Sequence, residues 1–369
     1  MTRLTVSVQP RPYEAVIESG ILTKVGNFLP ELFADSFLAS RQMFAVTVPR
    51  VRRRWGKVLT QSLTAAGFKP RLIDMPDGEP YKRLATVEKL AEKLAQSGAD
   101  RSSVILALGG GVVGDVAGLL ASLYMRGVDV VQIPTTVLAQ VDASIGGKTG
   151  VNLHAGKNLL GTFHQPLAVL IDPDVLTSLP EREFRAGLYE SIKCGVIGKP
   201  ALFDFLSSTD AKRLRRNPAK LAWVIAESVK LKAEVVSSDE RESGLRRVLN
   251  FGHTIGHALE AETGYRQFLH GEAVAWGMIA ATNISVATDR IDHQAANRVT
   301  EAVLRLGPLP GVRVNGRSIL HLLQTDKKTR NGKLHFVLPR EIGRVEIASN
   351  VPDKVVLEAI DELKRVSKG

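Results

Sequence analysis

The run Val104-Ile-Leu-Ala-Leu108 constrains the fold of this chain more than any other segment. A short, continuous apolar run of this length is typical of a buried strand. It leads directly into Gly109-Gly110-Gly111-Val112-Val113-Gly114-Asp115 and then into an apolar helical segment. A buried strand, a glycine turn and a helix in this order predict one unit of a mostly parallel sheet covered by helices.

The same alternation of strands and helices extends over residues 1–185. The other strand candidates are Leu4–Val8, Met43–Thr47, Lys69–Met75, Val128–Ile133 and Ala168–Asp172, with helical patterns at Arg54–Ala66 and Leu84–Ser97. From Glu181 onward long amphipathic stretches dominate, at Glu183–Ile197, Pro218–Ser237, Phe251–Thr263, Gly271–Asp289 and Asp292–Leu306. We therefore expect an α/β domain over residues 1–180 and an all-α domain over residues 181–369, with Pro180 at a helix start.

Composition excludes several classes of protein. The N-terminus lacks the apolar core of a signal peptide, and no apolar run is long enough to span a membrane. A single cysteine, Cys194, cannot form an intramolecular disulfide and fits a reducing compartment, so we expect a cytoplasmic protein. The net charge of +11 raises the possibility of nucleic-acid binding, but the basic stretches near Arg52 and Arg213 are not interleaved with aromatic residues. The alternatives, which we favour, are a solvated basic surface or a site for an anionic substrate.

The glycine turn has the spacing of a nucleotide-binding motif. Gly109, Gly111 and Gly114 match G-x-G-x-x-G between a strand and a helix, where a pyrophosphate binds at the helix N-terminus. The alternative is a tight turn that only permits close packing of the helix on the sheet. The next strand ends in Thr135-Thr136 instead of an acidic residue, so a ribose would have to be recognised elsewhere.

Two lysines lie in glycine-containing segments that we expect to be loops. Gly146-Gly147-Lys148-Thr149 ends like a phosphate-binding P-loop, but Asp142 occupies the position of the first glycine of that motif. Lys157 follows in Gly156-Lys157-Asn158. The two lysines suit a phosphorylated or carboxylated ligand, although solvated loop lysines are an equal alternative.

Three of the eight histidines fall within eighteen residues. His253 and His257 are four residues apart on one helical face, and His270 follows. With a carboxylate such as Glu190, two histidines form a common catalytic metal site. Spacing nominates His253 and His257 but does not distinguish a ligand from a neighbouring residue, and buried histidines with a structural role are the alternative.

Taken together these motifs resemble the 3-dehydroquinate synthase family, over nearly the whole chain. The resemblance is carried by Pro76–Lys82, Gly109–Asp115, Pro134–Thr136, Gln140–Asp142, Gly146–Thr149, Gly156–Asn158, Glu190–Lys193, Leu231–Glu234, Asp239–Glu242, Gly244–Arg246, Asn250–His257, Leu269–Glu272 and Asp326–Lys328. It implies a Rossmann-like N-terminal domain and a helical metal-binding C-terminal domain.

The resemblance also implies a role for individual residues. The metal, zinc or cobalt, would be held by Glu190, His253 and His270, which leaves His257 beside the ligands as a candidate proton relay. NAD contacts are implied for Asp77, Gly78, Glu79, Pro80, Tyr81, Lys82, Gly111, Val112, Val113, Gly114, Asp115, Thr135, Thr136, Asp142, Lys148, Lys157 and Ser178, the last standing where the family often has Thr. Substrate contacts are implied for Lys157, Asn158, Lys193, Lys232, Arg246, Asn250 and one of Lys327 and Lys328, with Glu242 orienting the basic groups.

The implied reaction converts 3-deoxy-D-arabino-heptulosonate 7-phosphate (DAHP) to 3-dehydroquinate and phosphate, in the shikimate pathway of aromatic amino acid biosynthesis. An alcohol is oxidised transiently with NAD, phosphate leaves by β-elimination, the ketone is reduced again, and the opened ring closes by an intramolecular aldol step. The carboxylate and phosphate of this substrate account for the many basic residues. The alternatives are another sugar phosphate cyclase or a metal-dependent polyol dehydrogenase of related fold. The resemblance further suggests a homodimer without nucleic-acid or membrane partners.

Overall fold

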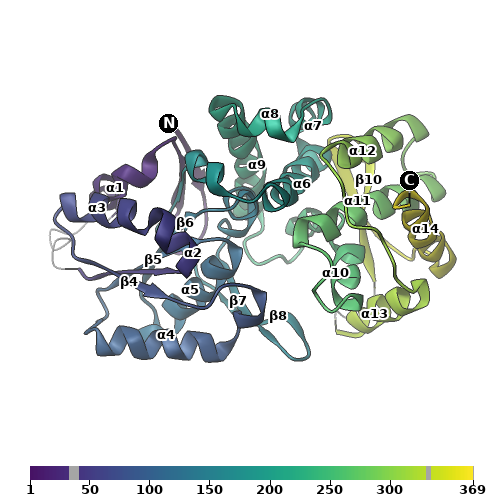
Figure 1. Cartoon of the computed structure of the whole chain (residues 1–369). Coiled ribbons are helices and arrows are strands. Elements are labelled where there is room, and N and C mark those ends of the chain that lie inside the picture. Colours follow the sequence, from purple (N-terminus) through teal and green to yellow (C-terminus); the bar gives the residue numbers. More distant parts are fainter. Residues whose placement is uncertain (33–40, 330–333, 369) are drawn as a thin grey trace. The chain divides into compact units, whose positions relative to one another are not determined.

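The computed structural model describes residues 1–32, 41–329 and 334–368, without the side chains of residues 325–329. Its internal contacts divide the chain into two compact units (Figure 1). The first unit combines Met1–Leu179 with Pro218–Glu240, and the second combines Pro180–Asn217 with Arg241–Gly369. The chain first passes from one unit to the other between Leu179 and Pro180, where the sequence predicts a domain boundary. The segment Pro218–Glu240 nevertheless returns to the first unit, so the units are not contiguous halves of the chain.

The first unit is built on a seven-stranded sheet in the order β1-β2-β9-β6-β5-β3-β4. All neighbouring strands are parallel except the edge pair β1 and β2. The strands are β1 (Thr2–Val6), β2 (Tyr13–Ile17), β3 (Met43–Thr47), β4 (Pro70–Asp74), β5 (Val104–Gly109), β6 (Asp129–Pro134) and β9 (Ala168–Ile171). The predicted mostly parallel sheet is therefore confirmed, and β5 is buried along its whole length, as its apolar run requires.

Helices flank this sheet. They are η1 (Ile21–Lys24), α1 (Val25–Leu32), α2 (Pro49–Val51), η3 (Arg52–Gly56), α3 (Lys57–Ala65), η4 (Glu79–Tyr81), α4 (Leu84–Gln96), α5 (Gly111–Leu123), η5 (Tyr124–Arg126), η6 (Ala139–Ala143), η7 (Pro173–Ser178) and α9 (Pro218–Ser238). One hydrophobic cluster joins the apolar faces of α4 and α5 to alternate residues of β3, β5 and β6, including Phe44, Ile105 and Val130. This packing fixes the start of α5, and with it the glycine turn, against the sheet.

The two lysine segments form a hairpin and not loops. Strands β7 (Lys148–Leu153) and β8 (Gly156–Phe163) pair antiparallel as a separate two-stranded sheet. The sequence of the two strands is rich in glycine and polar residues and lacks the apolar alternation of a half-buried strand. Strand β8 in particular has little buried surface, so it needs no apolar face. The pattern that identifies buried strands could not detect this hairpin.

The second unit is mainly helical, which confirms the predicted helical C-terminal half. Its helices are α6 (Glu181–Gly198), α7 (Pro200–Ser207), α8 (Ala211–Arg215), η8 (Leu245–Asn250), α10 (His253–Glu262), α11 (His270–Ala287), α12 (His293–Arg305), α13 (Gly316–Thr329) and α14 (Asp353–Val366). A hairpin of β10 (His335–Glu341) and β11 (Arg344–Ser349) adds strands that the sequence pattern did not predict. Helix α11 is apolar almost all round and is packed by α6, α10, α12, α14 and β10. A helix buried on every side forms the core of a helical unit.

Candidate active site

Glycines bring the three helices that carry the candidate metal ligands unusually close together. A Cβ atom on Gly277 of α11 would lie 1.8 Å from the carbonyl oxygen of Gly252, and one on Gly271 would lie 1.8 Å from that of Ala186 in α6. Gly252 itself has φ 79°, a left-handed conformation that glycine adopts without strain, and it directly precedes α10. The close approach places the first residue of α10, His253, and the first residue of α11, His270, near the middle of α6.

Glu190 of α6 faces both of these histidines. Its Oε1 atom lies 3.8 Å from Nε2 of His253 and 3.7 Å from Nε2 of His270. The carboxylate is 1% exposed, and Oε1 accepts no hydrogen bond from any residue that the structure describes. Two ligand atoms bound tetrahedrally about 2.1 Å from one ion lie about 3.4 Å apart, so only a small contraction is needed to coordinate a metal.

The other ring nitrogens determine the tautomers of these histidines. Nδ1 of His253 lies 3.2 Å from the carbonyl oxygen of Phe251, and Nδ1 of His270 lies 3.2 Å from Oε2 of Glu260. Both partners are acceptors, so each Nδ1 carries a proton and each neutral ring keeps its lone pair on Nε2. The lone pairs therefore face Glu190, and a buried carboxylate oxygen without a hydrogen-bond partner completes a set of three donors that fits Zn²⁺ or Co²⁺.

His257 offers a second ligand combination. It lies one helical turn after His253, with ring centroids 5.2 Å from His253 and 5.7 Å from His270. One nitrogen from each of these three rings can be chosen so that all lie within 4.8 Å of one another. The distances alone admit either His257 or Glu190 as the third ligand. The buried, unsatisfied oxygen of Glu190 favours the carboxylate, since His257 is exposed.

The predicted basic residues of the second unit lie at different depths around this centre. The ammonium group of Lys193 forms an ion pair with Oε2 of Glu190, and both side chains are almost fully buried. Arg246, in η8, is 2% exposed. Asn250 donates its side-chain amide to Oε1 of Glu242 at 2.6 Å, which connects two residues of the predicted substrate site. Lys327 and Lys328 lie in α13, but their side chains are outside the described part of the chain.

In the first unit the glycine turn follows β5, where the order of the strands changes direction. The chain leaves β3 toward β4 on one side and leaves β5 toward β6 on the other. Ligands of open parallel sheets bind beyond the carboxyl ends of the strands at such a point. No side chain of the described residues caps the first amide groups of α5, so these amide groups remain available to an anion. Gly114 also has a packing role, because a Cβ there would lie 2.9 Å from Oε1 of Gln132 in β6.

Two lysine–aspartate pairs lie among the predicted cofactor residues of this unit. Lys82 is 4% exposed and its Nζ atom lies 2.5 Å from both Oδ2 of Asp115 and Oδ1 of Asn158. Burial raises the pKa of the Asp115 carboxyl group, and the nearby Lys82 ammonium opposes that rise. Lys232, in α9, donates to Oδ1 of Asp142 at 2.6 Å. Predicted substrate and cofactor residues far apart in sequence are thus in direct contact within the first unit.

The remaining predicted cofactor residues vary in exposure. Thr135 is buried and donates its backbone amide to the carbonyl oxygen of Gly109, whereas Thr136 accepts from the amide of Ala139 at the start of η6. Lys148 is exposed, as is Asp77, which forms an ion pair with Arg50. The Ser178 hydroxyl donates to the carbonyl oxygen of Val175 and accepts from Trp55.

Sequence reasoning missed three residues that support these sites. Glu260 holds His270, Asn152 joins two of the predicted cofactor segments, and Arg182 binds Glu272 through two hydrogen bonds of 2.7 Å. Glu260 lies two helical turns after His253, so helical periodicity could have found it. The motif His270-Gly-Glu272 also gains an explanation, because Glu272 accepts from the amide of Leu269 at the start of α11.

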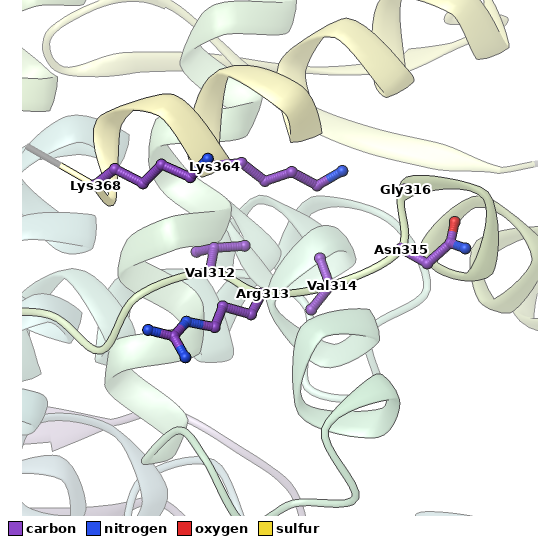
Figure 2. Close-up of a pocket in the computed structure, with 7 residues that line it drawn as sticks. All are labelled: Val312, Arg313, Val314, Asn315, Gly316, Lys364 and Lys368. Carbon is purple, nitrogen blue, oxygen red and sulfur yellow. The ribbon is translucent and has the colours of Figure 1, made fainter.

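An open groove elsewhere in the second unit has no such convergence. It is lined by Val312, Arg313, Val314, Asn315, Gly316, Lys364 and Lys368. Figure 2 shows the Arg313 side chain running away from those of Lys364 and Lys368. Because its charged groups diverge, the groove is not a candidate active site.

Family models match most of the chain. The 3-dehydroquinate synthase N-terminal model matches residues 72–186, and the 3-dehydroquinate synthase C-terminal model matches residues 187–329. A curated 3-dehydroquinate synthase from Koribacter versatilis is 53% identical over 367 residues, covering 100% of this chain and 99% of the relative. The chain belongs to the 3-dehydroquinate synthase family. Another family member, from Solibacter usitatus, is 50% identical and covers 98% of this chain and 99% of its own.

Solved structures of enzymes other than 3-dehydroquinate synthases share this fold. The 2-epi-5-epi-valiolone synthase ValA from Streptomyces hygroscopicus subsp. jinggangensis, solved with NAD⁺ and Zn²⁺, has a TM-score of 0.87 at 28% identity and covers 98% of this chain and 99% of its own. A 2-deoxy-scyllo-inosose synthase, solved with carbaglucose-6-phosphate, NAD⁺ and Co²⁺, has a TM-score of 0.86 at 27% identity, with 98% and 100% coverage. Within the described residues, every helix is too short or too polar to cross a membrane.

Proposed function

We propose that this chain is a 3-dehydroquinate synthase, a phosphorus–oxygen lyase that converts DAHP to 3-dehydroquinate and phosphate with NAD and a divalent metal. Membership of the family supports the reaction. The single structural observation that carries the proposal is the convergence of the Glu190 carboxylate with the Nε2 atoms of His253 and His270. The cofactor and metals named for the two solved relatives agree with this donor set.

Bound NAD supplies a hydride acceptor that is regenerated within each turnover, and a bound Zn²⁺ or Co²⁺ supplies a Lewis acid for the substrate hydroxyls. Glu190, His253 and His270 would hold the metal. A set of only three protein donors would leave coordination positions for the substrate. His257 is exposed beside this set, where a neutral imidazole near pH 7 can accept and return a proton.

The protein's own contribution is orientation and charge complementation. Lys193, Lys232 and Arg246 are almost fully buried cations, which suit the carboxylate and phosphate of DAHP when water is excluded. Asn250, oriented by Glu242, would add a neutral hydrogen-bond donor or acceptor for a hydroxyl group. Lys157 and Asn158 would meet both cofactor and substrate, and one of Lys327 and Lys328 would complete the basic set.

The segment Asp77–Lys82, the turn Gly111–Asp115 and the residues Thr135, Thr136, Asp142, Lys148, Lys157 and Ser178 would bind NAD. The uncapped first turn of α5 supports a pyrophosphate there, since amide groups and the helix dipole both favour an anion. The pair Lys82 and Asp115 would then face the bound cofactor. A single buried cysteine, Cys194, supports a reducing compartment such as the cytoplasm.

A comparison of substrates tests the reaction. Purified protein is supplied with NAD, Zn²⁺ and either DAHP, sedoheptulose 7-phosphate or glucose 6-phosphate, and phosphate release is followed. We expect release from DAHP alone and its loss after treatment with a chelator. Preferential release from another sugar phosphate would assign a different cyclase activity, and steady accumulation of NADH without phosphate would indicate a polyol dehydrogenase.

We further propose a homodimer in which the β7–β8 hairpin meets a second copy of the chain. Four large apolar side chains of this hairpin are exposed, namely Leu153, Leu159, Leu160 and Phe163, at 42%, 60%, 38% and 46%. The hairpin has no further strand partner within the described residues. Exposed apolar groups on an unpaired strand edge favour association. Light scattering should give twice the chain mass, and Leu159→Glu should lower it; a monomer at micromolar concentration would refute the dimer.

A further inference from the structure

Asn152 is a buried residue that connects two segments that the proposed function assigns to NAD. It lies in β7, is 7% exposed, and uses every polar group that it has. Its Nδ2 atom donates to Oε1 of Glu79 at 2.8 Å, and its Oδ1 atom accepts from the amide of Asn158 at 2.9 Å. Its backbone amide donates to the carbonyl oxygen of Lys82 at 2.8 Å, and its carbonyl oxygen accepts from Arg83 at 3.4 Å.

These partners leave one orientation for the Asn152 side chain. The Glu79 carboxylate can only accept and the Asn158 amide can only donate, so the amide group of Asn152 cannot be turned over without losing both bonds. An aspartate in its place would set two carboxylates against each other. The position therefore requires one donor and one acceptor on a planar group of this size.

One of the residues that Asn152 holds has an unusual backbone conformation. Asn158 has φ 55°, a left-handed conformation that costs energy for a residue with a side chain. In that conformation its Oδ1 atom accepts from the Lys82 ammonium, which also contacts Asp115. Nζ of Lys157 lies 3.7 Å from the same Glu79 oxygen that Asn152 binds. The side chain of Asn152 is thus connected to Lys82 through Asn158 and to Lys157 through Glu79.

We infer that Asn152 is a positioning residue for NAD: it holds the Glu79–Lys82 segment against the tip of the β7–β8 hairpin, so that Lys82, Lys157 and Asn158 are preorganised before the cofactor binds. The inference rests on the proposed function only for the identity of the ligand. Preorganisation lowers the ordering cost of binding, so loss of Asn152 should weaken NAD more than it weakens folding.

The test compares four variants of the full chain, namely Asn152→Asp, Glu79→Gln, the double variant of these two, and Thr162→Val. Asn152→Asp removes the donor to Glu79 and adds repulsion, whereas the double variant Asn152→Asp with Glu79→Gln restores one donor–acceptor pair with reversed roles. Thr162→Val is the matched control, because Thr162 lies in the same hairpin and bonds Thr149 of β7 and Ser122 of α5 but not the Glu79–Lys82 segment. NAD affinity is measured by calorimetry, and hydrogen exchange of the Asn158 amide is measured by NMR without any ligand.

We expect Asn152→Asp to raise the Kd for NAD by about tenfold or more, the effect of losing one buried hydrogen bond, and to accelerate exchange at Asn158. The double variant should bind NAD about as well as Glu79→Gln alone, and Thr162→Val should change neither quantity. Unchanged exchange at Asn158 in Asn152→Asp would overturn the inference, as would an equal loss of NAD affinity in Thr162→Val. If the unmutated chain binds no NAD, the proposed function fails, and the exchange experiment still decides whether Asn152 holds the two segments together.

Discussion

Glu260 provides a sharp test of how the metal centre is held. Its Oε2 atom receives the Nδ1 proton of His270 at 3.2 Å, and the side chain is 3% exposed. The His270 ring is 28% exposed, so without Glu260 it can turn its Nε2 atom away from Glu190. We predict that Glu260→Ala weakens zinc binding while leaving the three proposed ligands in place.

The magnitude follows from this single contact. A hydrogen bond to a buried charged group contributes about 1.5–3 kcal/mol, which corresponds to roughly a tenfold to a hundredfold loss of affinity. Residues that orient metal ligands have effects of the same size, about 10–100-fold. Glu260→Gln keeps an oxygen acceptor without the charge, and uncharged hydrogen bonds are about half as strong, so its loss should be several-fold.

The assay is competition for zinc between the metal-free protein and a chromophoric chelator. Glu262→Ala is the matched control, because it removes the same charge from the same helix, α10, at a side chain with no partner among the described residues. Equal zinc affinity for Glu260→Ala and the unmutated protein would refute the proposed orientation of His270. Equal losses of zinc affinity in Glu260→Ala and Glu262→Ala would show that the loss comes from the change in net charge and not from the contact with His270.

Three further predictions concern packing, pH and metal retention. Gly271→Ala should lower the free energy of unfolding in urea by about 1–3 kcal/mol or more, because its Cβ would lie 1.8 Å from the Ala186 carbonyl oxygen. Gly244→Ala is the control, because a Cβ there would meet no atom of the described residues within 4 Å. Equal stabilities of the two variants would contradict the close approach of α6 and α11. Burial raises the pKa of the Tyr189 hydroxyl in the folded protein. Its contribution to the free energy of unfolding is therefore complete below the ordinary pKa of about 10, and it is lost at higher pH because the unfolded chain loses the proton first. Urea denaturation between about pH 9 and 11 should therefore show a shallower decline for Tyr189→Phe than for the unmutated protein, and parallel curves would argue against this. Glu190→Ala should fail to retain zinc through gel filtration and should release no phosphate from DAHP; full metal content would exclude this carboxylate as a ligand.

Buried elements were the most predictable from sequence. Strand β3 occupies the predicted residues Met43–Thr47, and β5 extends the predicted run by one residue to Gly109, because continuous apolar runs report burial directly. The hairpin β7–β8 was not predictable in this way, since its strands are stabilised by pairing with each other and β8 remains largely exposed. Helix α9 was predicted, but its membership of the first unit was not, because amphipathicity does not specify which surface a helix covers.

The candidate site likewise contains residues that the sequence pattern could place and residues that it could not. Helical spacing correctly places His253 and His257 on one face of α10. It cannot place Glu190, which is sixty-three residues earlier and approaches only because glycines let α6, α10 and α11 pack closely. The contact between Asn152 and Glu79 was equally hard to predict, because it joins residues 73 positions apart in the sequence. Local patterns identify elements, whereas sites built from several elements require tertiary structure or family resemblance.

The proposed function requires that Glu190, His253 and His270 together hold the catalytic metal. Crystals grown with Zn²⁺ should show an anomalous difference peak at the zinc edge within about 2.0–2.2 Å of a Glu190 carboxylate oxygen and of Nε2 of both histidines. His257 should lie beside this peak without bonding to it. A peak bonded to His253, His257 and His270, with Glu190 still paired only with Lys193, would contradict the account.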